Sequence, residues 1–211
     1  MNKKLRDWFQ SKLPEVLEDM NGPAEPEQIS SLEEKLAVEF PADFTALYLS
    51  HNGQKDQINT GFFYGLSFLS LDGIYNQWRS WAEIVDSESE ESMKELSMFS
   101  KSHVKGLVKE TYANKKWVPF AYDWGGNFLG LDFDPDLNGK VGQIINFGRD
   151  EDEKFVLANS FSEFIEWYIS ELESGNYNIV LEEDGGKSFN TKKPASGHFL
   201  DSVREMFQKN A

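Results

Sequence analysis

The sequence of 211 residues contains no cysteine and no long apolar run. The absence of cysteine excludes disulfide bonds, thiolate metal ligands and cysteine nucleophiles. No apolar stretch approaches the roughly 18 residues that a membrane-spanning helix needs. The first ten residues include basic side chains but no apolar segment of the kind found in signal peptides. We therefore expect a cytoplasmic protein that does not enter or bind a membrane.

Basic residues are scarce relative to acidic ones. Lysine and arginine number 21 against 36 aspartate and glutamate residues, which gives a net charge of −15. An acidic surface repels nucleic-acid phosphates and anionic lipids, so we expect no direct binding to nucleic acid. The same surface could attract a basic protein or serve only to keep the chain in solution, and charge alone leaves both readings open.

Aromatic residues, by contrast, are abundant, with 17 Phe, 7 Tyr and 6 Trp. A chain of this length and composition can bury a large core, so we expect a folded protein rather than a disordered one. We predict one domain over residues 1–175 and a C-terminal extension over residues 176–211 that packs on the same domain.

The clearest pattern lies in residues 117–147. It consists of three strand-like runs at residues 117–122, 128–133 and 141–147. In the middle run, Leu129, Leu131 and Phe133 alternate with glycine and aspartate, which is the two-residue period of a half-buried strand. The intervening segments are rich in Gly, Asn and Asp, as tight turns require. We predict a three-stranded antiparallel meander at the centre of the domain.

Apolar residues at helical spacing predict helices before and after this meander. We expect helices over about residues 5–20, interrupted at Pro14, and over 26–38, 44–48, 72–85, 161–172 and 199–207. Asp72 is a candidate N-cap. Ser160 and Glu163 have capping-box spacing, and Gly53 and Gly175 suit the left-handed position that follows a helix.

Other segments give weaker patterns. We expect a hairpin from residues 62–64 and 68–71, helix near the end of 93–113, strands at 154–158 and 177–181, and a polar loop over 182–194. The acidic stretch 86–92 fits a solvated loop or a helix start. The fold class is therefore α+β, with a mainly antiparallel sheet packed by N-terminal, middle and C-terminal helices.

The search for catalytic and metal-binding motifs gives one candidate. Asp134, Asp136, Asn138 and Gly139 match the first half of a calcium-binding loop, but Ile145 stands where the bidentate glutamate should be. Aspartate and asparagine also favour ordinary turns, because they hydrogen-bond their own backbone. The three histidines lack a second ligand at metal-binding spacing. We predict no catalytic residue, no resident metal and no cofactor, and hence a protein that is not an enzyme.

Candidate partner contacts are the exposed acidic residues of the 86–92 stretch and two turn residues. They are Glu88, Glu90, Glu91, Trp124 and Asp136. Carboxylates of this kind steer a basic partner during diffusional encounter.

Several short motifs occur in an order that resembles one known superfamily. They are Asn52-Gly53-Gln54, residues 117–121 (WVPFA), 131–135 (LDFDP), 142–145 (GQII) and 158–165 (ANSFSEFI). Together with Trp8, Leu13-Pro14 and Phe40-Pro41, they resemble the SUKH superfamily, which contains the fungal Smi/Knr cell-wall regulators. The resemblance spans about residues 5–172. It departs at Asp123-Trp124 and after Gly175.

This resemblance implies an α+β fold and a function in protein binding. Many bacterial members are immunity proteins that neutralise toxins, often nucleases, and fungal members are regulatory scaffolds. Our leading hypothesis is an immunity protein that binds a cognate toxin such as a basic nuclease. The alternatives are an intracellular regulatory scaffold without a toxin partner, and an enzyme that uses a metal or small ligand at the Asp-rich turns. The toxin's identity, the interface and the oligomeric state stay open.

Overall fold

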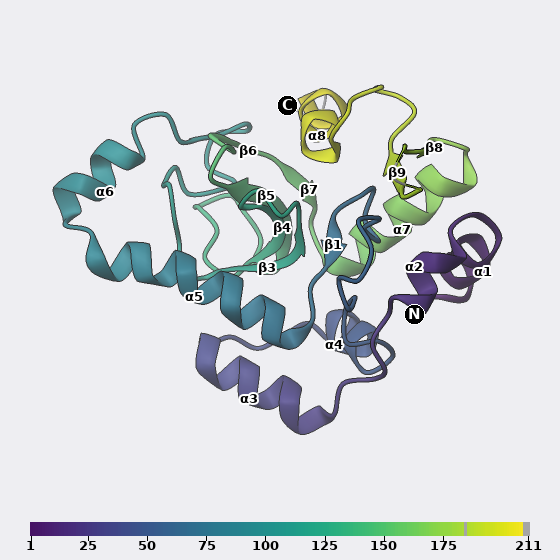
Figure 1. The fold of residues 1–211 in the computed structure, drawn as a ribbon. Coiled ribbons are helices and arrows are strands. Elements are labelled where there is room, and N and C mark those ends of the chain that lie inside the picture. The colour runs from purple at the N-terminus through teal and green to yellow at the C-terminus, as the bar shows by residue number, and fades with distance from the viewer. Residues whose placement is uncertain (184, 209–211) are drawn as a thin grey trace.

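Residues 1–183 and 185–208 are described by a computed structural model of the protein. Asp184, within the predicted polar loop, and residues 209–211, within the predicted extension, lie outside the described residues. The fold is α+β, as expected. Figure 1 shows a central sheet with helices on both sides. No helix in the described part of the chain combines the length and the apolar character needed to cross a membrane.

The sheet has five strands in the order β1-β3-β4-β5-β7, and every neighbouring pair is antiparallel. These strands are β1 (Ser67–Phe68), β3 (Trp117–Tyr122), β4 (Asn127–Asp132), β5 (Gln143–Gly148) and β7 (Val156–Ala158). Two short pairs lie outside this sheet, β2 (Lys101–Ser102) with β6 (Glu153–Lys154), and β8 (Asn178–Leu181) with β9 (Lys187–Asn190). The predicted meander β3-β4-β5 is confirmed, and β1 and β7 extend it at its two edges.

The helices in the described residues are α1 (Lys3–Lys12), α2 (Pro14–Glu18), α3 (Pro26–Leu36), α4 (Ala42–Tyr48), α5 (Leu71–Ser87), α6 (Glu90–Leu96), α7 (Phe161–Glu173) and α8 (Phe199–Phe207). Pro14 starts a second helix rather than kinking the first. The N–H groups of a helix's first turn have no partner within the helix, so the N–H that proline lacks is not missed there. Ser160 caps α7 by accepting a hydrogen bond from Glu163 N at 3.2 Å. The start of α7 was predicted from the spacing of Ser160 and Glu163, whereas the sequence left open whether Pro14 kinks one helix or starts a second.

The prediction that the central strand is half-buried was wrong, because both faces of the sheet are covered. Every residue of β4 is buried. On one face, Leu129 and Leu131 belong to a large core shared with α1, α4 and α7. On the other face, Phe128 and Phe147 pack with Trp81 of α5 in a smaller core. Figure 1 shows α5 and α7 on opposite sides of the sheet.

In the sequence, Gly130 and Asp132 gave β4 the pattern of a strand with one solvent-exposed face. A Cβ on Gly130 would lie 2.5 Å from Cε1 of Phe147, so the missing side chain makes room for that ring. Asp132 is fully buried, and it accepts hydrogen bonds from Gln143 Nε2 at 2.9 Å and from Asp134 N at 3.0 Å. A small residue and a satisfied carboxylate can therefore face a core.

The connection from α4 to α6 differs from the prediction in three ways. Residues 62–71 form no hairpin of their own, since β1 pairs with β3 and only a Phe63–Leu66 bridge precedes it. The N-cap of α5 is Ser70, which accepts from Gly73 N at 3.1 Å, and Asp72 lies in the first turn. Of the two readings of the acidic stretch 86–92, the loop was wrong and the helix start was correct, because α5 ends at Ser87 and α6 starts at Glu90.

Two further expectations were wrong. The end of the 93–113 segment is irregular rather than helical, and it contains β2. The supposed polar loop 182–194 contains β9, which pairs with β8 in register Ile179–Phe189. Phe189 is buried and its ring centroid lies 5.5 Å from that of Trp8 in α1. The division of the chain at residue 175 stays a prediction.

Candidate protein-binding groove

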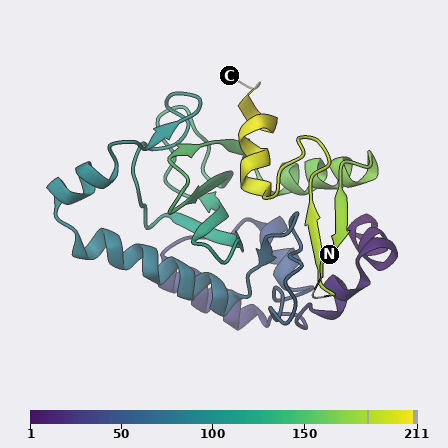
Figure 2. The same ribbon diagram turned by 45° about the horizontal axis from the view of Figure 1, so that its top comes forward.

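A groove of about 820 Å³ lies between α7 and α8, with β7 as its floor. The two helices lie side by side in Figures 1 and 2. The floor consists of residues 155–159, and the walls come from one stripe of α7, the C-terminal end of α8 and the segments 103–107 and 193–194. This volume is within the range of ligand and peptide sites in proteins, about 300–1,000 Å³.

The walls of this α7–α8 groove are held in place by packing from below. The ring centroid of Trp167 lies 5.4 Å from that of Phe207 and 6.3 Å from that of Phe199. The buried hydroxyl of Ser202 lies 2.6 Å from Oγ1 of Thr191, which itself donates to Pro194 O at 2.7 Å. The groove is therefore formed by anchored elements rather than by loose side chains.

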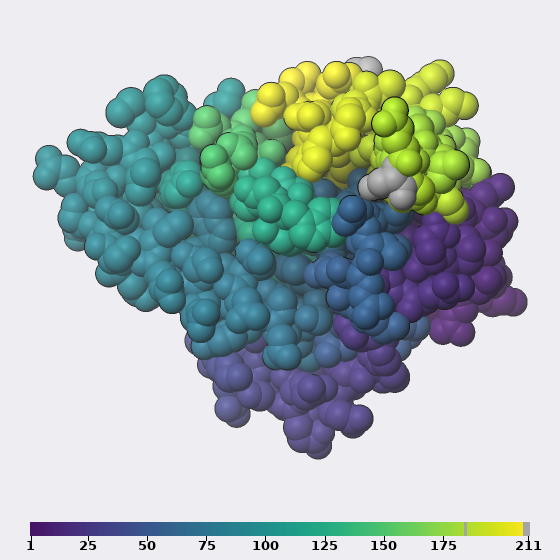
Figure 3. All heavy atoms as spheres, in the orientation of Figure 1, coloured from purple at the N-terminus to yellow at the C-terminus, as the bar shows by residue number. Residues whose placement is uncertain are grey.

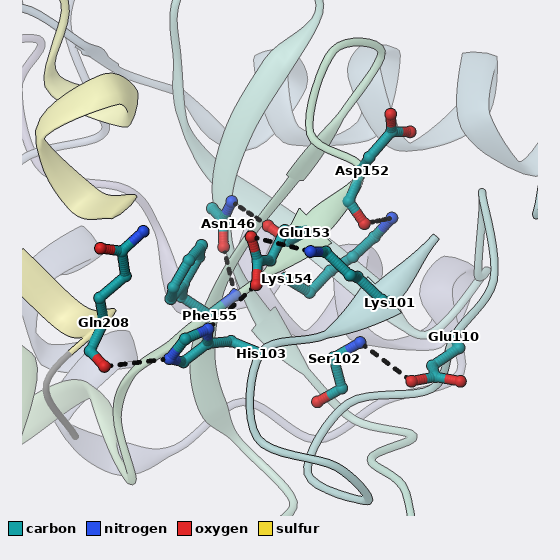
Figure 4. A network of polar contacts seen from close by, with 10 residues as sticks. All are labelled: Lys101, Ser102, His103, Glu110, Asn146, Asp152, Glu153, Lys154, Phe155 and Gln208. Atoms are coloured by element: carbon teal, nitrogen blue, oxygen red, sulfur yellow. Dashed lines mark hydrogen bonds and ion pairs between the residues drawn. The ribbon is translucent and has the colours of Figure 1, made fainter. Parts of the chain in front are cut away.

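A network of polar contacts closes one end of the groove (Figure 4). His103 stacks on Phe155 with ring centroids 4.5 Å apart. Its Nδ1 lies 3.0 Å from Glu153 Oε1, and its Nε2 lies 3.3 Å from Gln208 O. Burial acts to raise the pKa of Glu153, but hydrogen bonds from His103 and Lys101 outweigh it and hold the pKa below its ordinary value. The network joins β2 and β6 to the end of α8.

Asn146 of β5 explains why the predicted strand 154–158 is broken into two. Its Oδ1 accepts from Phe155 N at 2.6 Å, and its Nδ2 donates to Glu153 O at 3.0 Å. A side chain therefore replaces the backbone partners that a regular ladder would supply at this point. The chain bends there, and Phe155 is directed into the core.

Lys154 is buried beside this break. Its Nζ donates to Ser100 Oγ at 3.1 Å. It also donates to Asp152 O at 3.3 Å (Figure 4). Burial lowers its pKa to about 8, although Asp152 and Glu151 oppose that shift. The ammonium also lies 5.9 Å from the ring centroid of Trp117. These contacts hold β6 and the segment before β2 together.

Glu151 supplies a pH-dependent contribution to stability. Burial raises its pKa to about 7, against hydrogen bonding from Asn146 and the charge of Arg204. Between about pH 4.5 and 7 the folded protein retains a proton that the unfolded chain has released, so raising the pH through this window lowers the free energy of unfolding. Glu151→Gln cannot ionise, and we expect it to exceed the native protein in stability by about 1–3 kcal/mol at pH 8 and by less at pH 5.

Urea unfolding at the two pH values measures this difference. The exposed Glu166 of α7 provides a control, because Glu166→Gln removes no buried side chain and should change stability by no more than about 0.5 kcal/mol. A Glu151→Gln effect that is the same at pH 5 and pH 8 would contradict the assigned role.

The five predicted partner-contact residues do not form one surface. Glu88 is the C-cap of α5, and Glu90 and Glu91 lie in the first turn of α6. All three are exposed. The α5–α6 junction to which they belong lies at the left of the molecule in Figures 1 and 3. Trp124 is 43% exposed in the β3–β4 turn and has a φ of +61°. Asp136 lies in the β4–β5 connection, at the opposite end of the meander.

None of these five residues lines the α7–α8 groove. The groove residues that sequence reasoning missed include Trp167, Val156 and Met206. For Trp167 the sequence did contain a signal. Glu163, Trp167 and Glu171 recur every four residues, which places an aromatic residue between two acidic residues on one helix face. The partner-contact assignments of the five residues stay predictions.

The Asp-rich turns are occupied by internal contacts. Asp134 accepts from Lys109 Nζ at 2.5 Å and from Asn114 Nδ2 at 2.9 Å. Asp136 accepts from Leu137 N at 2.8 Å, and Asp123 accepts from Gly125 N at 2.7 Å. Within residues 1–183 and 185–208, no three His, Asp or Glu side chains are grouped as metal ligands. Asp123 and Asp136 therefore shape their own turns, and Asp134 ties its turn to the 109–114 segment.

Comparison with known proteins places the chain in a family. The model of the SMI1 / KNR4 family (SUKH-1) matches residues 23–167. The chain belongs to this family. The resemblance drawn from the sequence motifs is thereby confirmed, and the match extends from the segment before α3 into α7.

The SMI1/KNR4 relatives are fungal. The cell wall assembly regulator SMI1 of Saccharomyces cerevisiae is 30% identical over 205 residues, covering 84% of this chain and 41% of that protein. The cell wall biosynthesis/cell cycle regulator smi1 of Schizosaccharomyces pombe is 30% identical over 162 residues, covering 74% and 32%. The glucan synthesis regulatory protein of Neurospora crassa is 25% identical over 210 residues, covering 86% and 39%. The chain thus spans less than half the length of each.

These relatives correct the leading hypothesis. The interpretation as a bacterial immunity protein of a toxin–antitoxin pair was wrong, because the SMI1/KNR4 relatives are eukaryotic proteins named as regulators of the cell wall and of glucan synthesis. They are named as regulators rather than as enzymes. The comparisons contain nothing on a toxin or nuclease partner, and the cytoplasmic location stays a prediction.

Proposed function

We propose that this chain is a non-enzymatic, protein-binding module that regulates cell wall assembly. The observation that carries the proposal is its membership of a family whose relatives are named as cell-wall and glucan-synthesis regulators. The α7–α8 groove supports it, because a groove with apolar and acidic walls suits recognition of another protein. This is the scaffold that the sequence left open as an alternative.

A domain exchange tests the proposal. In the Saccharomyces cerevisiae relative, the region aligned with this chain would be replaced by the chain itself, and growth would be measured under cell wall stress in cells that lack the native gene. We expect the chimera to restore growth beyond a truncated protein without the region, because the module supplies the missing contacts. A chimera expressed at the native level that grows no better than the truncation would contradict the proposed function.

A further inference from the structure

We propose that the α7–α8 groove binds a basic amphipathic helix of a partner protein. This inference rests on the proposed function of protein binding, and it adds the place of binding and the chemistry of the partner. Three features of the groove favour such a helix: its apolar surface, the negative charge of its rim and the irregular backbone of its floor.

The apolar surface comes from side chains that are only partly covered by the protein itself. Trp167 and Met206 are half-buried at the groove. Below them, Leu157 and Phe207 are 6% exposed and belong to the core. Because Leu157 and Phe207 are held in the core, they are not free to move into the groove and fill it. An apolar side chain of a partner would therefore bury apolar surface that is exposed to solvent in this chain.

The rim of the groove carries carboxylates without cationic partners. Its charged side chains are Glu163, Glu171, Glu205 and Lys193, besides the network residue His103. Within the described residues, none of the first four takes part in an ion pair. In the part of the chain that the structure describes, the side-chain carboxylates of Glu163 and Glu171 accept hydrogen bonds from neutral groups of Asn159 and Asn176 alone. The rim is net negative, so it favours lysine and arginine in the occupant.

The charge of the whole chain argues against a second copy as occupant. Each copy carries a net charge of −15. Two such molecules repel one another, and the acidic rim would add to that repulsion where the copies meet. A basic partner, in contrast, is attracted by the rim and by the field of the whole protein.

The floor favours a helix over an added strand. β7 is the last strand of the sheet, but its pairing with β5 shifts register between Ile144 and Ile145, which leaves Leu157 as an extra residue. Strand addition requires a regular row of backbone groups, and a bulge interrupts that row. α8 also packs against β7. A partner strand would therefore find an irregular edge that is partly covered.

The spacing along α7 matches a second helix. Glu163, Trp167 and Glu171 lie at four-residue intervals and all line the groove. They span about 12 Å, or roughly two turns. A partner helix lying between α7 and α8 would direct its apolar stripe at Trp167 and Met206, and its flanking lysines or arginines at Glu171 and Glu205.

A displayed library of peptides of about 14 residues, randomised in sequence and selected for binding to the full chain, tests the proposal. We expect the enriched peptides to carry apolar residues at helical spacing with lysine or arginine beside them. With an enriched peptide, the double variant Glu171→Lys/Glu205→Lys should raise the dissociation constant by about tenfold or more, because it replaces attraction between the rim and the peptide by repulsion. The matched control, Glu27→Lys/Glu34→Lys in α3, should change it by less than about twofold, because those exposed residues lie outside the groove.

Circular dichroism of each variant shows whether it is folded, and Met206→Lys gives a second, independent block of the same groove. Enrichment of peptides without helical periodicity, or of peptides with a two-residue period, would overturn the proposal of a helix. Equal binding by the native chain and both groove variants would overturn the site. If the chimera carrying Glu171→Lys/Glu205→Lys restores growth as well as the unmodified chimera does, the groove proposal fails while the proposed function stands.

Discussion

Phe120→Ala should lower the free energy of unfolding by about 3–5 kcal/mol, as large-to-small changes of buried phenylalanines do. Phe120 has no solvent exposure in β3, at the centre of the larger core. Its ring centroid lies 5.4 Å from Phe161, 5.5 Å from Phe63 and 5.6 Å from Phe164. Those rings come from α7 and from the segment before β1, so the loss would leave a cavity between elements that cannot all close in.

The matched control is Phe99→Ala, because Phe99 is 71% exposed after α6. It should change the free energy of unfolding by no more than about 0.5 kcal/mol. Urea unfolding followed by tryptophan fluorescence compares the two variants. Equal losses for Phe120→Ala and Phe99→Ala would show that the sheet face carrying Phe120 does not form the core.

Gly53→Ala should cost about 2–5 kcal/mol, the sum of a strained backbone and an overpacked contact. Gly53 has a φ of +67°, and a Cβ there would lie 2.4 Å from the backbone C of Leu69 and 2.4 Å from the backbone N of Ser70. Backbone atoms cannot rotate away as a flexible side chain can. Either the connection after α4 or the start of α5 would therefore have to move.

Gly22→Ala is the control for this glycine. No atom lies within 4 Å of the position that its Cβ would occupy. Thermal unfolding should therefore show a large fall in melting temperature for Gly53→Ala and a small change for Gly22→Ala. A Gly53→Ala protein as stable as Gly22→Ala would contradict the close approach of the two backbone segments.

Gly53 also shows how a local signal can be correct for an incomplete reason. Its position after a helix predicted a left-handed backbone, and the backbone is left-handed. The C-cap of α4, however, is Leu49, four residues earlier. The requirement for glycine comes from Leu69 and Ser70, which are distant in sequence.

The candidate sites follow the same division. The sequence marked Trp124 and Asp136 as turn residues of the meander, and both are in turns. Antiparallel connectivity places the β3–β4 turn and the β4–β5 connection at opposite ends of the strands, so these residues cannot share one contact surface with each other. The family resemblance was correct because its motifs, like the turns, are short runs of neighbouring residues that can be recognised in the sequence. Those motifs did not distinguish fungal regulators from bacterial immunity proteins.

The elements whose signals are local could be predicted from the sequence. The meander and the helix that Ser160 caps depend on alternation and on capping, and each signal acts within a few residues. Pro14 marked an interruption in the sequence, and the structure decided that a second helix starts there. The packing of distant segments decided the burial of both faces of β4, the places of β1 and β7 at the two edges of the sheet, the pairing of β9 and the α7–α8 groove. The physical reason is that each of these depends on segments far apart in the chain: α5 covers Phe128, and α8 packs beside Trp167.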